Sequence, residues 1–295
     1  MRGLAEKTKT LIAAARTILE AEHPMTVRQL FYRLVSARVI DNSRGDYQRV
    51  SKAMTLARTQ GSVDYDMIVD RSRTSYRSTD WKNLGQLTET MERALQNYRR
   101  DAWQDQPYHV EVWCEKDAVT GSIEEIRREY GVDVIAIRGF NSTSNVHEAG
   151  TRLWEYTHNG KKPVILYLGD WDPSGKDIER DLVSRLRADT GMEIEVQRIA
   201  IFQADIRQFN LPPLRVKDTD SRAEGFKELY GNEAVELDAL PPTELRRRLR
   251  EAIELLIDPA AWQRSKAVEA VQRETCNRYA GVLRRMVDDC GQQSG

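Results

Sequence analysis

The sequence predicts an α/β protein with an α-rich N-terminal part. Two observations lead to this prediction. Up to about residue 100, apolar residues recur at helical spacing in several segments. After residue 107, short apolar runs alternate with amphipathic helices, a pattern that indicates a parallel sheet with helices on both faces. A chain of 295 residues has room for about two domains, and we expect them at 1–104 and 105–295.

The N-terminal part begins with three expected helices. The first covers 4–22 and ends at His23-Pro24, because a residue before proline avoids the helical region. Thr26 caps the second, the third covers about 46–60, and an extended segment at 62–69 follows. Three short helices and a strand are typical of a winged-helix-like module that reads DNA, although other small helical units give the same spacing. A further helix is expected over 83–100.

The second part is expected to alternate strands and helices. The strands are expected at 109–114, 132–137, 163–169 and 194–201, and the helices at 117–130, 144–158 and 174–190. A polar loop at 210–222 follows. A short strand at 235–240 and helices at 243–257 and 260–288 complete the chain.

Composition excludes several classes of protein. Charged residues make up 31% and hydrophobic residues 40% of the chain, which argues against disorder. No apolar run reaches the roughly 18–20 residues that cross a bilayer, and the N-terminus has no signal-peptide core. We therefore expect a cytoplasmic protein. The three cysteines and four histidines lack disulfide or zinc spacing, so only a hard cation held by carboxylates remains as a metal candidate.

The charge is unevenly distributed along the chain. The net charge is −1, but residues 1–104 carry 18 Lys and Arg against 12 Asp and Glu, a net of +6, and the remainder carries −7. Such asymmetry is a hint of a nucleic-acid-binding part. On charge alone, solvated helix faces are the favoured explanation.

Three carboxylates lie where two predicted strands end. Glu115 follows the strand at 109–114, and Asp170 and Asp172 follow the strand at 163–169. Ligands of doubly wound sheets bind outside the carboxyl ends of the strands, and clustered carboxylates repel one another unless a cation neutralises them. Mg²⁺ prefers such oxygen ligands. Asp172 before Pro173 is also an ordinary helix cap that needs no metal.

A strand ending in Glu, followed by a strand ending in Asp-x-Asp, resembles the Toprim domain of topoisomerases, primases and some nucleases, over about 108–202. Glu115-Lys116-Asp117-Ala118 and Asp170-x-Asp172-Pro173-x-Gly175 are similar to the A subunit of topoisomerase VI and its meiotic double-strand-break relatives. The short chain is closest to the free-standing "mini-A" relatives. The resemblance implies a Rossmann-like parallel sheet and Mg²⁺, with Mn²⁺ as a possible substitute, held by Glu115, Asp170 and Asp172, with Glu115 among the catalytic residues.

The same family places a nucleophilic tyrosine in its winged-helix-like domain, and Arg28-Gln29-Leu30-Phe31-Tyr32 resembles that motif. On a helical wheel Tyr32 points roughly 130° away from the apolar face. We therefore expect a tyrosine outside the core, either a nucleophile or a plain surface residue. A free phenol is a weak nucleophile at neutral pH, and Arg28 can stabilise the phenolate or hold the phosphate. Attack on a DNA phosphate would give a 5′-phosphotyrosyl link.

Other basic residues are candidates for contacts with double-stranded DNA. They are Arg49, Lys52, Arg71, Arg73 and Lys116. Each is equally well explained by a solvated face or a local ion pair. The resemblance also implies a homodimer in which the tyrosine and the metal come from different subunits, possibly a separate ATPase subunit, and association with the nucleoid.

The resemblance is incomplete. Gln29 replaces an acidic residue, and 138–144 does not match the family's Gly-Tyr-Pro-Asp stretch. Two other functions remain open: a Toprim nuclease that uses metal and water, and a non-catalytic DNA-binding accessory protein.

Overall fold

The computed structural model describes residues 6–69, 80–137, 143–218 and 220–292. By its internal contacts the chain divides into two compact units, one formed by 1–73 and 108–256 and the other by 74–107 and 257–295. The first unit thus joins the N-terminal helices to the sheet. The domain boundary expected at 104/105 is based on a change in sequence pattern and not on contacts between residues, and it stays a prediction.

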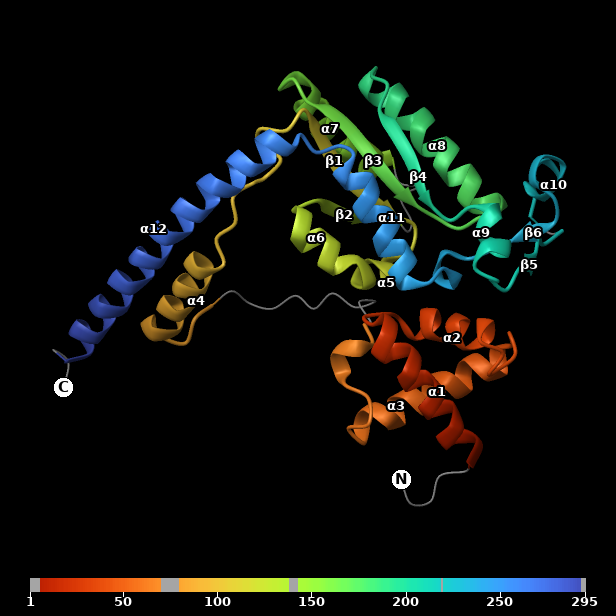
Figure 1. The fold of residues 1–295 in the computed structure, drawn as a ribbon. Helices are drawn as coiled ribbons and strands as arrows, with labels where there is room; N and C mark the ends of the chain where they lie inside the picture. Colours follow the sequence, from red (N-terminus) through yellow and green to blue (C-terminus); the bar gives the residue numbers. More distant parts are fainter. Residues whose placement is uncertain (1–5, 70–79, 138–142, 219, 293–295) are drawn as a thin grey trace. The chain divides into compact units, whose positions relative to one another are not determined.

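The first unit contains a four-stranded parallel sheet (Figure 1). The strands are β1 Tyr108–Cys114, β2 Asp133–Ala136, β3 Lys162–Leu168 and β4 Glu195–Ala200, in the order β2-β1-β3-β4. The predicted α/β class and parallel sheet are therefore confirmed, while the Toprim and winged-helix assignments stay predictions. β1 and β3 are buried along almost their whole length, as expected for strands covered on both faces.

Alternate side chains of the central strands build the core under two helices. Trp113 of β1 and Ile165 and Tyr167 of β3 are fully buried on one face. There they meet the apolar sides of α7 Thr143–His158 and α8 Pro173–Thr190. Successive strand residues point to opposite faces, so Val112, Val164 and Leu166 are buried on the other side of the sheet.

A buried carboxylate stands in the middle of β1. Glu111 is fully buried and accepts hydrogen bonds from the Arg152 guanidinium, at 2.8 and 3.1 Å, and from the Trp113 indole, at 2.8 Å. His109 Nε2 lies 3.0 Å from it. These contacts lower the pKa of Glu111 to about 2 despite its burial, so the charge is compensated within the sheet.

The N-terminal helices are α1 Glu6–Glu22, α2 Val27–Ser36 and α3 Arg44–Thr59. Thr26 caps α2 as predicted, with its hydroxyl accepting from the Gln29 N–H. The extended segment expected at 62–69 is largely wrong, because Tyr65–Met67 forms a 3-10 helix (η1) and only Ile68 pairs with Met25 in an isolated bridge.

Several shorter elements complete the first unit. The helix expected at 117–130 is interrupted, giving α5 Asp117–Thr120, η2 Gly121–Ile123 and α6 Glu124–Tyr130. The segments after β4 are α9 Gln203–Gln208, β5 Leu214–Arg215, α10 Ala223–Tyr230, β6 Glu233–Ala234, η3 Leu237–Ala239 and α11 Pro242–Glu254. The strand expected at 235–240 is therefore wrong, since only 233–234 pair with β5 and a 3-10 turn follows.

In the second unit, α4 Leu84–Gln96 packs along α12 Pro259–Gln292. The Tyr98 hydroxyl donates to Gln272 at 2.9 Å and Arg284 donates to Glu92 at 2.8 Å. Within the described ranges, no helix combines the length and apolarity that a membrane crossing needs.

Candidate active site

The strand order places a switch point between β1 and β3. From β1 the chain passes to β2 on one side and then crosses to β3 on the other. The carboxyl ends of two such strands bound the crevice where doubly wound sheets take ligands. Glu115 directly follows β1, and Asp170 and Asp172 follow β3, so the sheet brings these separate sequence segments to one edge.

The Glu115 carboxylate is bonded to the backbone of Asp170. The Asp170 N–H donates to Glu115 Oε2 at 3.0 Å. The loop passes so close here that a Cβ added to Gly175 would lie 2.4 Å from the Asp170 carbonyl oxygen and 3.2 Å from Glu115 Oε2. Glycine at position 175 therefore permits the close approach of this loop to Glu115.

Asp172 caps α8, with one side-chain oxygen accepting from the Gly175 N–H at 2.6 Å and Pro173 in the first turn. This confirms the helix-cap interpretation of Asp172. Over the described ranges, no three His, Cys, Asp or Glu side chains are arranged as around a metal ion. The positions of these side chains do not test the magnesium site, which stays a prediction.

The chemistry of these acids nevertheless suits a cation. Burial, Asp170 and Asp172 together raise the pKa of Glu115 to about 7. Burial also raises the pKa of Asp170, although Lys116 and the Leu237 N–H oppose that rise. Acids whose charged forms destabilise one another in this way are stabilised by a nearby cation, and carboxylate oxygens are of the donor type that Mg²⁺ prefers, although the described side chains are not gathered around one point.

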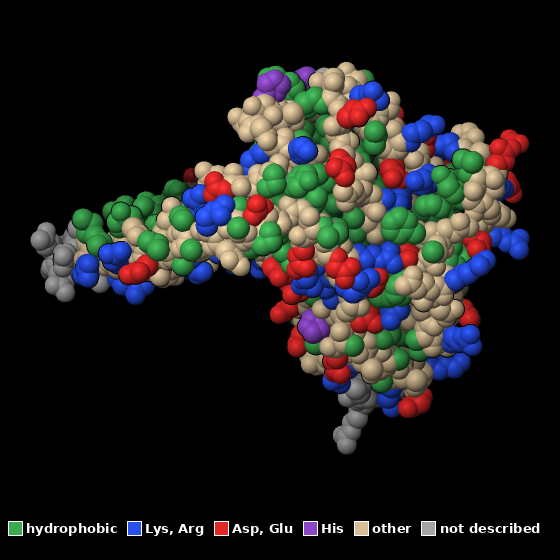
Figure 2. Space-filling view, turned by 45° about the horizontal axis from the view of Figure 1, so that its top comes forward, with side chains coloured by type: hydrophobic (Ala, Val, Ile, Leu, Met, Phe, Trp, Pro, Cys, Tyr) green, Lys and Arg blue, Asp and Glu red, His purple; other side chains and the backbone are tan. Residues whose placement is uncertain are grey.

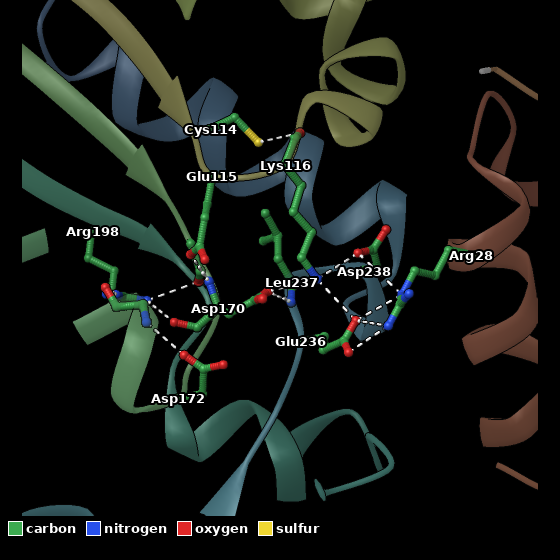
Figure 3. Close-up of polar contacts among 12 residues, drawn as sticks. Arg28, Cys114, Glu115, Lys116, Asp170, Asp172, Arg198, Glu236, Leu237 and Asp238 are labelled. Atoms are coloured by element: carbon green, nitrogen blue, oxygen red, sulfur yellow. Dashed lines mark hydrogen bonds and ion pairs between the residues drawn. The ribbon is translucent and has the colours of Figure 1, made fainter. Parts of the chain in front are cut away.

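Lys116 and Arg28 meet a second set of carboxylates (Figure 3). Lys116 Nζ lies 3.0 Å from Asp170, 3.0 Å from Glu236 and 2.8 Å from Asp238. Arg28 of α2 approaches the same group and donates to Glu236 through Nε at 2.8 Å and Nη2 at 2.6 Å. Two cations and three carboxylates therefore form a continuous network between α2 and the edge of the sheet.

Tyr32 lies one turn after Arg28 but is only 4% exposed. The expectation that Tyr32 lies outside the core is therefore wrong. The helical wheel shows one apolar face of α2, whereas the fold packs α2 against η3 as well as against α1 and α3. Burial raises the pKa of Tyr32 to about 12, Glu236 adds to the rise, and Arg28 and Lys116 oppose it. The Arg28 guanidinium lies 5.8 Å from the centre of the Tyr32 ring.

A cavity of about 640 Å³ connects the carboxylate edge with the N-terminal helices. Its walls include Glu115 and Asp170 from the sheet, Arg28 from α2, and Tyr47 and Ser51 from α3. Tyr32 is not among its walls. Tyr47 packs edge-on against Phe31, with 5.5 Å between ring centres, and is thus a second tyrosine near the site.

Arg198 supports the loop that carries Asp170. Its Nη1 donates to the carbonyls of Gly169, Asp170 and Ile201 at 3.0 to 3.2 Å. Its side chain is 5% exposed, and it pairs with Glu179 at 2.8 Å. This arginine therefore fixes the backbone from which the Asp170 side chain projects.

Apart from Lys116, the predicted DNA contacts fall into two groups. Arg49 and Lys52 are exposed on α3, where Arg49 pairs with Asp46 at 3.0 Å. Arg71 and Arg73 lie outside the described residues. On the face drawn in Figure 2, Lys and Arg side chains are interspersed with Asp and Glu, so this face shows no continuous basic surface.

Gln29 has a local explanation. Its side-chain oxygen accepts from the Thr26 N–H at 2.8 Å, and its amide nitrogen donates to the Ser122 hydroxyl at 3.3 Å. The residue is fully buried. A neutral amide supplies both an acceptor and a donor here, whereas a carboxylate supplies acceptors only.

Sequence reasoning missed Glu236, Asp238, Arg198 and Tyr47. Two acids inside the apolar run 234–240 were a usable signal, because buried charges need partners.

Comparison of the chain with protein-family models, curated proteins and solved structures gave no match.

Proposed function

We propose that this chain is a DNA strand-breaking transesterase, similar to the A subunit of type IIB topoisomerases, with Tyr32 as its nucleophile. One observation carries the proposal. A single cavity is lined both by Glu115 and Asp170 at the switch point and by Arg28 of the helix that bears Tyr32. Arg28 and Glu115, which are 87 positions apart in the sequence, thus line the same cavity.

In the proposed reaction, Tyr32 Oη forms a bond to the phosphorus of one DNA phosphodiester. The bond from phosphorus to the 3′ oxygen breaks, and that oxygen leaves with the electron pair. The tyrosine hydroxyl gives up its proton, and the 3′ oxygen takes one up. Arg28 stabilises the phenolate or the developing charge on the phosphate. Glu115, whose pKa is about 7 in the metal-free chain, is a carboxylate that a bound cation would keep ionised.

Glu115, Asp170 and Asp172 are the residues that would hold Mg²⁺, and Mn²⁺ would be accepted by the same oxygen donors. A bound divalent cation supplies charge stabilisation at the leaving oxygen and the phosphate. Lys116, beside Asp170, adds positive charge at the same edge.

A metal-dependent nuclease that uses water is the second candidate. The burial of Tyr32, and its absence from the walls of the cavity, favour it. In that case the carboxylates and the metal perform the reaction and Tyr32 has only a packing role.

Incubation with duplex DNA and Mg²⁺ or Mn²⁺, followed by denaturation, distinguishes the candidates. The transesterase gives a covalent protein–DNA adduct that Tyr32→Phe and Asp170→Ala each abolish. Free 5′ ends that persist in Tyr32→Phe and disappear in Asp170→Ala support the nuclease. A chain that binds DNA but leaves it intact in either metal supports an accessory role.

A homodimer is part of the proposal, with the tyrosine of one subunit acting beside the metal of the other. It rests on the family resemblance alone, because Tyr32 is absent from the walls of its own chain's cavity but is also buried within that chain. We expect a mixture of Tyr32→Phe and Asp170→Ala chains to nick DNA, because such a heterodimer retains one intact site. A mixture that stays inactive would place both groups in one chain.

A further inference from the structure

The Glu236 carboxylate is bound by two cations, Arg28 and Lys116. It accepts from Arg28 Nε at 2.8 Å, from Arg28 Nη2 at 2.6 Å and from Lys116 Nζ at 3.0 Å. A planar guanidinium donating two bonds, with an ammonium beside it, is an arrangement that binds phosphate as well as carboxylate.

The position of the pair also suits an external anion. Arg28 and Lys116 both line the 640 Å³ cavity, together with Glu236 itself. The Arg28 side chain is 47% exposed and that of Glu236 is 20% exposed. An anion that enters the cavity therefore reaches the guanidinium without unfolding any element.

Of the three carboxylates bound to Lys116, that of Glu236 is the most exposed, at 20% against 11% for Asp170. Asp238 is 1% exposed, and its Oδ1 is buried without a hydrogen-bond partner in the described part of the chain. Asp170 is also held, because its Oδ1 accepts from the Leu237 N–H at 2.7 Å. Glu236 precedes η3, and its side-chain hydrogen bonds go only to Arg28 and Lys116 among the described residues.

We propose that Arg28 and Lys116 form a binding site for one phosphodiester of DNA, and that Glu236 occupies this site until DNA displaces it. The inference rests on the proposed function for the identity of the ligand. Glu236 then limits DNA affinity in the free chain, and Arg28 becomes available beside Tyr32 only when a phosphate has replaced the carboxylate. The same displacement is needed whether Arg28 serves its own chain or a partner.

Binding of a 20-base-pair duplex, measured in EDTA so that no cleavage occurs, tests the proposal. Glu236→Gln keeps the shape of the side chain but removes its charge. We expect it to bind DNA roughly tenfold more tightly, since a hydrogen-bonded charge pair no longer competes with the phosphate. Glu251→Gln is the matched control, because Glu251 is an exposed glutamate that pairs with Arg247 on α11, and we expect a change of less than about twofold.

The Glu236→Gln substitution in an Arg28→Gln chain shows whether Glu236 lowers DNA affinity by occupying the arginine or by general repulsion of the DNA. There, the gain from Glu236→Gln is expected to be clearly smaller than in the wild-type background, because only Lys116 remains to be released and the two substitutions of a contacting pair are not additive. A gain that persists undiminished in that background overturns the proposal. So does an unchanged or weaker affinity of Glu236→Gln, or the absence of DNA binding in both the wild type and this variant.

A second measurement on the unaltered chain covers the case in which Glu236→Gln does not fold. Titration with inorganic phosphate is expected to shift the Arg28 Nε–H resonance, and the shift is expected to be lost in Lys116→Gln. No shift in the wild type overturns the site. Both measurements are of binding, so a chain that forms no adduct can still confirm the anion site, and the two proposals fail separately.

Discussion

Arg28 donates two hydrogen bonds to Glu236, 2.8 and 2.6 Å long, across a sequence separation of 208 residues. This contact links the helix of the candidate nucleophile to the segment that follows β6. Because Glu236 also contacts Lys116, which pairs with Asp170, four residues connect α2 with the carboxyl end of β3. In the proposed mechanism a DNA phosphate replaces Glu236 in this connection.

Glu111 is expected to give the protein an acid-labile part of its stability. Its pKa in the folded chain, about 2, lies below the ordinary value of 4.5. The charged form is therefore stabilised by folding, and this contribution is present above about pH 4.5 and is lost as the pH falls towards 2. Glu111→Gln should cost about 3 kcal/mol at pH 7, a difference from wild type that closes as the pH approaches 2.

Urea unfolding at pH 7, 4 and 2.5 measures this difference. Glu155→Gln, on the exposed side of α7, is the control and should follow the wild type at each pH. A Glu111→Gln deficit that is the same at all three pH values would contradict the explanation.

Arg246 of α11 is expected to hold the end of α1 beside η2. Its buried guanidinium donates to the backbone carbonyls of Glu22, Pro24 and Ser122, at 2.9 to 3.2 Å. Arg246→Met leaves these buried acceptors unpaired and should lower the free energy of unfolding by about 2–4 kcal/mol. Arg247→Met, which removes an exposed arginine on the same helix, should change the urea midpoint little. Equal losses in the two variants would show that Arg246 has no such role.

Asp172 is expected to have two separable roles. Asparagine is also a good N-cap, so Asp172→Asn should keep the stability of the metal-free chain within about 0.5 kcal/mol, whereas Asp172→Ala should lose about 1 kcal/mol. Both variants should lose the rise in melting temperature on adding Mg²⁺, because a charged ligand is missing. Thermal melts in EDTA and in Mg²⁺ measure both effects. An Asp172→Asn chain that Mg²⁺ stabilises as much as the wild type would exclude Asp172 as a ligand.

The sequence predicted best those structural features that depend on a single helix or strand. The alternation after residue 107 predicted four parallel strands, and Thr26 and Asp172 cap the helices expected of them. The burial of Tyr32 was missed because a helical wheel considers α2 alone, whereas burial depends on what packs on its other faces. Glu236 and Asp238 were missed because the apolar residues around them suggested a strand, and their partners are more than 100 residues away.

The identity of the nucleophile is the central claim, and peptide mapping of the covalent adduct tests it most directly. Trypsin releases Tyr32 within residues 29–33 and Tyr47 within residues 45–49, so mass spectrometry after nuclease digestion tells the two tyrosines apart. We predict a nucleotide attached to Tyr32, with an adduct yield that Tyr47→Phe leaves largely unchanged and Tyr32→Phe abolishes. A nucleotide on Tyr47, or an adduct that survives Tyr32→Phe, would contradict this account.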